Sequence, residues 1–140
     1  MRGSSLYLLP CLLALQSACT GLTAGPEVAA SIAAPVPRDT AWVRTKRALQ
    51  AEVFTIAAED SLGGRITGMR YPSATARVGT PAACRVLVSY AIVDQSGSVE
   101  LASTSRWIAP AAMAAKPGMC EEDRQETLGR IQQTVAPSQQ

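Results

Sequence analysis

The sequence contains no histidine and no asparagine among its 140 residues. Without histidine the chain cannot form a Ser-His or Cys-His catalytic pair, a histidine metal site or a histidine pH switch. Its only lysines are Lys46 and Lys116, and neither follows a serine by three positions, so a Ser-x-x-Lys dyad is excluded as well. These absences favour a protein that is not an enzyme and that uses no metal or cofactor.

Charge and aromatic residues are also scarce. Charged residues make up 17% of the chain, and 13 Lys plus Arg against 11 Asp plus Glu leave a net charge of +2. So small a charge argues against a nucleic-acid partner held by bulk electrostatics. The hydrophobic content of 47% excludes a wholly disordered chain. Aromatics are only 4%, and we expect Trp42 and Trp107 to be core anchors.

The first 19 residues have the pattern of a secretory signal peptide. Arg2 supplies the positive end, and an uncharged apolar run of about ten residues follows from Leu6 to Leu15. That run is too short to span a bilayer core, which requires about 20 residues. Small residues then lead up to Cys19. The pattern predicts export from the cytosol.

The end of this segment, Leu15-Gln16-Ser17-Ala18-Cys19, resembles the lipobox of bacterial lipoproteins. Ser17, Ala18 and Cys19 match the last three positions, whereas Gln16 stands where the family has a leucine-like residue. The resemblance implies cleavage before Cys19 and acylation, with palmitate for example, of its sulfur. Because Thr20 and not aspartate follows the cysteine, the resemblance also implies the outer membrane. Ordinary signal-peptidase cleavage, which would leave a soluble periplasmic product, is the alternative.

The four cysteines fit an exported protein. Cys11 would leave with the signal and Cys19 would carry lipid, which leaves Cys84 and Cys120 as a pair. In an oxidising compartment we expect a Cys84–Cys120 disulfide. Two unpaired buried thiols are the alternative, and no further cysteine or histidine completes a metal site.

The remaining chain divides into a linker, one domain and a tail. Residues 20–38 are rich in Ala, Gly and Pro and predict a flexible tether, and residues 137–140 predict a frayed tail. Residues 39–136 form the expected domain, which is α+β in the order α-β-β-β-β-α. A four-stranded antiparallel sheet would pack against one or two helices. The expected strands are residues 53–58, 65–71, 84–93 and 99–107.

Two helices flank these strands in the expected order. The first begins at Asp39 or Thr40, and its apolar face contains Trp42, Thr45, Leu49 and Val53. The second runs from about residue 121 to 135, with acidic residues in its first turn and an apolar stripe of Leu128, Ile131 and Val135. A Cys84–Cys120 bridge would pin this second helix to the core face of the sheet.

Two clusters are candidates for function beyond the anchor. Between residues 61 and 93 the chain has four arginines and no acidic residue, which predicts a surface for an anionic partner; the four are Arg65, Arg70, Arg77 and Arg85. Glu59 and Glu100 are the carboxylates that a glycosidase-like hydrolase would need across a cleft. Scattered solvated arginines are the simpler explanation of the first cluster, and a polar turn is the simpler explanation of Glu59.

The sequence therefore favours a non-enzymatic envelope lipoprotein. It would act as a structural or accessory subunit on the periplasmic side of the outer membrane, held by its N-terminal lipid. Another envelope protein or a cell-wall component would be its partner, and its pattern of elements is similar to that of small envelope lipoproteins. The alternatives are a soluble periplasmic binding or inhibitor protein that uses the arginine-bearing hairpin, and an unrecognised carboxylate hydrolase.

Overall fold

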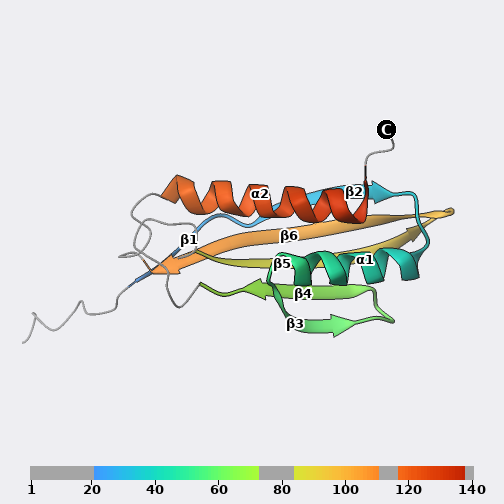
Figure 1. Cartoon of the computed structure of the whole chain (residues 1–140), viewed down its shortest axis with the longest axis horizontal. Coiled ribbons are helices and arrows are strands. Elements are labelled where there is room, and N and C mark those ends of the chain that lie inside the picture. Colours follow the sequence, from blue (N-terminus) through green and yellow to red (C-terminus); the bar gives the residue numbers. More distant parts are fainter. Residues whose placement is uncertain (1–20, 73–83, 111–116, 138–140) are drawn as a thin grey trace, which may run out of the picture.

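A computed structural model describes residues 21–72, 84–110 and 117–137. These residues form an α+β domain in which one antiparallel sheet is packed against two helices (Figure 1). The elements are, in chain order, β1 Leu22–Ala24, β2 Val28–Ala34, α1 Arg38–Ala51, β3 Thr55–Asp60, β4 Arg65–Arg70, β5 Arg85–Gln95, β6 Ser98–Pro110 and α2 Pro117–Val135.

The sheet has six strands, not the four that we expected. Its order is β1-β6-β5-β4-β3, and β2 pairs with β6 on the same side as β1. The four strands from β3 to β6 correspond to the expected ones. The two additional strands lie within residues 20–38, so the prediction of a flexible tether there is wrong for the described part of that segment.

The composition of β2 explains why the sequence pattern hid it. Val28, Ala30, Ile32 and Ala34 pair with residues of β6 that point to the core, and the residues between them point the other way. Because alanine stands on both faces, the alternation of large apolar and polar side chains that marks a strand is weak here. Its pairing partner β6 supplies the hydrogen bonds and the buried face instead.

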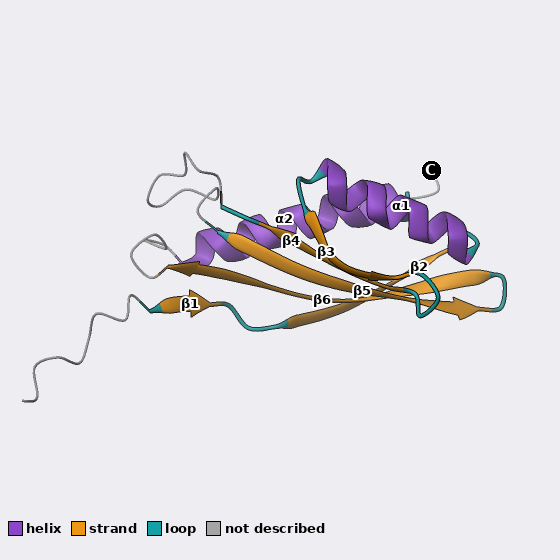
Figure 2. Cartoon of the chain, turned by 90° about the horizontal axis from the view of Figure 1, so that it is seen from below, coloured by secondary structure: helices purple, strands orange, loops and turns teal. Residues whose placement is uncertain are grey.

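Both helices lie on one face of the sheet, and in the described part of the chain no helix covers the other (Figure 2). We call the second face the open face. Alternating strand residues follow this division, since even-numbered residues of β5 and odd-numbered residues of β6 are buried. The core lies between sheet and helices and includes Leu49, Ile66, Val86, Leu101 and Ile131.

Helix α1 differs in detail from the expected one. It begins at Arg38 with Pro37 as N-cap, and no side chain caps it. Its buried residues are Ala41, Thr45, Ala48 and Leu49. Val53 was expected on this face, but it lies after the helix in the left-handed region (φ 62°) and is 77% exposed. For a β-branched residue this backbone conformation is unusual, and it turns the chain into β3.

Helix α2 begins at Pro117, earlier than expected. The stripe of Leu128, Ile131 and Val135 is buried, as predicted. The earlier start removes Glu121, Glu122 and Asp123 from the first turn, so the helix dipole is not the reason for their position. For Glu121 and Asp123 the reason is their contacts to arginines, described below.

Gly68 lets α1 approach the sheet closely. A Cβ atom built on Gly68 would lie 3.1 Å from Leu49 Cδ2 and 3.2 Å from Phe54 Cδ1. These distances are shorter than ordinary van der Waals contacts. A glycine in the middle of β4 therefore has a packing reason, because a methyl group there would require Leu49 or Phe54 to shift.

Candidate functional site

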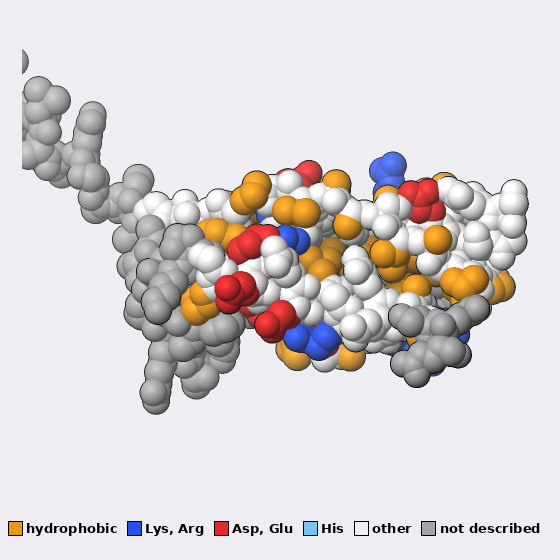
Figure 3. Space-filling model, turned by 90° about the horizontal axis from the view of Figure 1, so that it is seen from above, with side chains coloured by type: hydrophobic (Ala, Val, Ile, Leu, Met, Phe, Trp, Pro, Cys, Tyr) orange, Lys and Arg blue, Asp and Glu red, His pale blue; other side chains and the backbone are white. Residues whose placement is uncertain are grey.

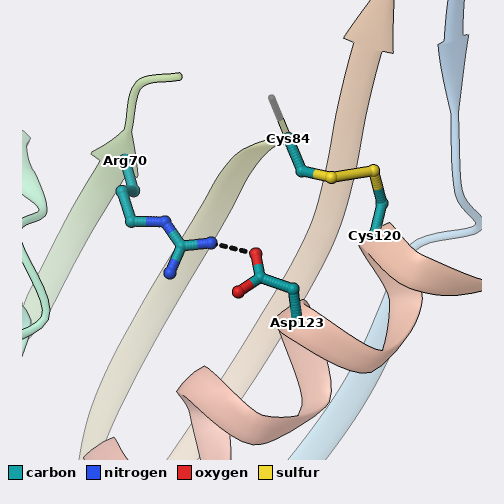
Figure 4. Close-up of a disulfide and its surroundings, with 4 residues drawn as sticks. All are labelled: Arg70, Cys84, Cys120 and Asp123. Carbon is teal, nitrogen blue, oxygen red and sulfur yellow. Dashed lines mark hydrogen bonds and ion pairs between the residues drawn. A yellow bond between two sulfur atoms is a disulfide. The ribbon is translucent and has the colours of Figure 1, made fainter. Parts of the chain in front are cut away.

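The predicted disulfide is present and joins Cys84, immediately before β5, to Cys120 in the first turn of α2 (Figure 4). The two Cα atoms are 5.6 Å apart, and both cysteines are buried. Trp107 and Ala109 of β6 are buried beside them in a second small core. The bridge thus pins the beginning of α2 to the core face of the sheet.

Arg70 contacts α2 next to the disulfide. Its guanidinium forms an ion pair with Asp123 (Figure 4). It donates a hydrogen bond of 2.9 Å to Thr127 Oγ1. It also lies over the Phe54 ring, 5.7 Å from the centroid. Burial raises the pKa of the Asp123 carboxyl and outweighs the attraction of Arg70. Arg70 is therefore engaged in holding the helix and does not face a partner.

A second arginine, Arg124, is buried one turn after Cys120 in α2. It donates a hydrogen bond of 2.8 Å to Ser105 Oγ and another of 3.1 Å, from Nε, to Glu121. The hydrogen bonds from Arg124 lower the pKa of the Glu121 carboxyl. Charged side chains at this end of α2 therefore have structural partners within the domain.

The opposite pKa shifts of Glu121 and Asp123 give a pH test. The lowered pKa of Glu121 means that its carboxylate stabilises the fold above its ordinary value of 4.5 and that this contribution is lost as pH falls through its lower folded value. We expect Glu121→Gln to be less stable than the wild type at pH 7, with the difference shrinking below pH 4.5. Urea unfolding across this pH range measures it.

The matched variant Asp123→Asn should show the reverse slope. The pKa of Asp123 in the folded protein is raised above its ordinary value of 3.8. The wild type therefore loses stability relative to this variant as the pH rises from 3.8 through the higher folded pKa. If the stability difference between variant and wild type changes with pH in the same direction for both variants, the pKa shifts assigned to these two carboxyls are wrong.

The structure does not bring the four predicted arginines onto one surface. Arg65 and Arg85 both project from the open face, whereas Arg70 points to the helices. Arg65 is opposite Ala91, six residues from Arg85 along β5, so the two are roughly 20 Å apart. Arg77 lies outside the described residues, as does Cys19. Arg65 and Arg70 separate because they are five positions apart on the same strand, β4, and successive residues of a strand point to opposite faces.

The carboxylates of the hydrolase alternative are not brought together either. Glu59 lies at the β3 edge and accepts a 2.7 Å hydrogen bond from Lys46 of α1. Glu100 projects from the open face of β6, where Ser31 and Gln95 donate hydrogen bonds to it. With β4 and β5 between their strands and helices on only one side, these two groups cannot flank one substrate bond.

The open face has a broad hollow of about 770 Å³ at its centre. Small side chains from four neighbouring strands form its floor, and Thr67 and Ser89 are hydrogen-bonded to each other at 3.0 Å. Its lining includes Ala29, Ser31, Ala91, Ala102 and Thr104, with Arg65 at one margin. The sequence does not reveal this hollow, because β2, which forms its edge, has alanine on both faces and no clear alternation.

The edge formed by α2 and β2 has a different character (Figure 3). Hydrophobic side chains are visible along it, and a cavity of about 180 Å³ there is lined by residues that include Val28, Leu128 and the buried Arg124. Acidic residues gather in the first half of α2, at positions 121, 122, 123 and 126. The helix side is thus acidic at the end where α2 begins.

Among the described residues there is no group of three or more acidic or cysteine side chains that could hold a metal ion. Nor is any described helix both long and apolar enough to cross a membrane.

Comparison with solved structures shows a similar fold in Ara h 8.0201. The solved structure of Ara h 8.0201 superposes with a TM-score of 0.57 at 9% identity, covering 82% of this chain and 96% of that one. TTHA0849 from Thermus thermophilus gives 0.46 at 12% identity, covering 79% and 94%. The di-domain ARO/CYC BexL gives 0.49 at 10% identity, covering 79% and 46%. No family model and no curated protein sequence matches the chain.

Proposed function

We propose that this protein is an envelope lipoprotein, anchored by lipid on Cys19 to the periplasmic side of the outer membrane, with a non-enzymatic structural or accessory role. The observation that supports this most directly is the disulfide between Cys84 and Cys120. Such bridges persist in oxidising compartments such as the periplasm and are rare in the cytosol. The lipobox-like segment ending at Cys19 agrees with that compartment.

The described contacts also fit an accessory role better than catalysis. Arg70, Asp123, Glu121 and Arg124 are occupied in fastening α2 to the sheet. The candidate carboxylates Glu59 and Glu100 belong to opposite faces of the sheet. The charged groups considered for catalysis are thus engaged or far apart, which leaves the exposed surface of the domain as the functional feature. Such a surface suits a subunit that binds another envelope protein or a cell-wall component.

Metabolic labelling with palmitate tests the anchor. We expect the wild-type protein to incorporate label and to remain with the membrane fraction, because acylated Cys19 would be its new N-terminus. Cys19→Ala should lose both the label and the membrane attachment. The measurement is radiolabel in the purified protein together with its distribution between membrane and soluble fractions.

Cys11→Ala is the matched control, since it removes a cysteine from the same segment and should keep the label. Label that survives Cys19→Ala would place the lipid elsewhere and refute this anchor. Export of an unlabelled wild-type protein would support the soluble periplasmic alternative.

A further inference from the structure

We propose that the half of the open face next to the anchor is a contact surface for an anionic membrane. The inference rests on the proposed anchor at Cys19, and it assigns the side of the domain that meets the lipid. We call the residues concerned the anchor-side patch; they are Leu22, Tyr71, Arg85, Arg106 and Ile108.

The strand register places these residues together. Arg85 is opposite Ile108 across β5 and β6, and Ile108 is opposite Ala24 of β1. Leu22 projects one row further out, opposite Pro110, and Arg106 one row further in, opposite Leu87. Because opposed residues in an antiparallel pair point to the same side, all of these side chains project from the open face.

The patch combines exposed apolar groups with positive charge. Leu22 is 70% exposed and Tyr71 is 55% exposed, although both are large and hydrophobic. The Arg85 guanidinium lies over the Tyr71 ring, 5.2 Å from its centroid. A tyrosine with an apolar body and a polar tip, beside arginine and leucine, suits the boundary between headgroups and acyl chains.

Charge distribution distinguishes this half of the face from the rest. Its strand residues include Arg85 and Arg106 and no acidic residue, whereas Glu100 and Asp60 project from the other half. Glu27, between β1 and β2, lies five positions after Leu22 of the patch. Among the described residues it forms no ion pair with Arg85 or Arg106. The acidic half of α2 lies on the opposite side of the sheet.

The position of the anchor brings the patch to the bilayer. Cys19 precedes Leu22 by three positions, so the chain between them spans at most about 10 Å. A surface tethered so closely meets the headgroups at high effective concentration, and even a weak patch is then occupied. Anionic lipid is the occupant that both the arginines and the anchor favour.

Oxidative footprinting on vesicles tests this contact. The processed chain from Cys19 onward contains every described residue, and Cys19 is its one thiol outside the disulfide. Coupling that thiol to a maleimide lipid supplies the anchor chemically. Hydroxyl-radical oxidation of Leu22 and Tyr71 is then compared, by mass spectrometry, on vesicles with about 30% phosphatidylglycerol and on phosphatidylcholine alone.

We expect Leu22 and Tyr71 to be protected on the anionic vesicles, while Leu62 and Val93, which are 91% and 49% exposed at the far end, are oxidised equally on both. Arg85→Gln with Arg106→Gln should weaken the contact on the order of 25-fold, since each basic residue at an anionic surface contributes about fivefold. Arg65→Gln, on the same face but far from the patch, should change nothing. Glu27→Gln should strengthen the protection.

Equal oxidation of Leu22 and Tyr71 on both kinds of vesicle would overturn the proposal, and so would protection that persists in the double arginine variant. Because the coupling is chemical, the result does not depend on lipidation in the cell. Failure of the palmitate experiment and failure of this surface are therefore separate outcomes.

Discussion

Removing the disulfide with Cys84→Ala and Cys120→Ala should lower the free energy of unfolding by about 4 kcal/mol. The bridge closes a segment with a sequence separation of 36, and the chain-entropy relation gives a value of that size for the unfolded state. A domain of this size has about 5–15 kcal/mol in total, so the loss is a large fraction. Guanidinium unfolding followed by far-ultraviolet circular dichroism measures it.

The reduced wild type is the control for this variant. It should unfold at the same denaturant concentration as the double alanine variant, and reductant should have no effect on the variant itself. A difference below about 1 kcal/mol between the oxidised wild type and the variant would show that Arg70, Asp123 and the core hold α2 without the bridge.

Leu49→Ala should lower the free energy of unfolding by about 3 kcal/mol or more. Leu49 is fully buried, and its truncation leaves a cavity between α1 and β4. Gly68→Ala alone should also destabilise, because its new methyl group would crowd Leu49 Cδ2 and Phe54. In the Leu49→Ala background the same methyl group enters the cavity and should restore about 1 kcal/mol.

A double-mutant cycle with denaturant unfolding tests this coupling. Leu101→Ala is the matched control, because Leu101 is equally buried but is not among the atoms nearest to Gly68. Gly68→Ala should be no less destabilising in that background than in the wild type. If Gly68→Ala restores nothing when Leu49 is truncated, the close approach of α1 to β4 is not what requires glycine.

The central strands could be predicted because their periodicity is strong. Val86, Val88, Tyr90 and Ile92 place large apolar side chains at every second position, although the residues between them are of mixed character. The stripe of α2 was equally clear. In α1 the pattern misled, because small buried residues, Ala41 and Ala48, share the core face with Leu49 and carry little hydrophobic signal.

The features that failed were those decided by long-range pairing. Strand β2 is held by β6, about 70 residues away, and its alanines give no local indication of which face is buried. The role of Arg70 depends on Asp123, 53 residues later, so its charge could not be assigned to a surface from its own neighbours. The disulfide could be predicted because Cys11 and Cys19 were assigned to the expected export signal, which left Cys84 and Cys120 as one pair.

The one-sided placement of the helices decides which surface a partner protein would contact if the sheet rests on lipid. If the anchor-side patch rests on lipid as proposed, α1 and α2 face the aqueous compartment, and the exposed Glu122 and Glu126 of α2 face it too. A partner protein would then contact the exposed sides of α1 and α2, while the open face of the sheet would be covered by lipid. Under that proposal, strands β1 and β2 would hold the domain close to the membrane surface, whereas a flexible linker would let it move away.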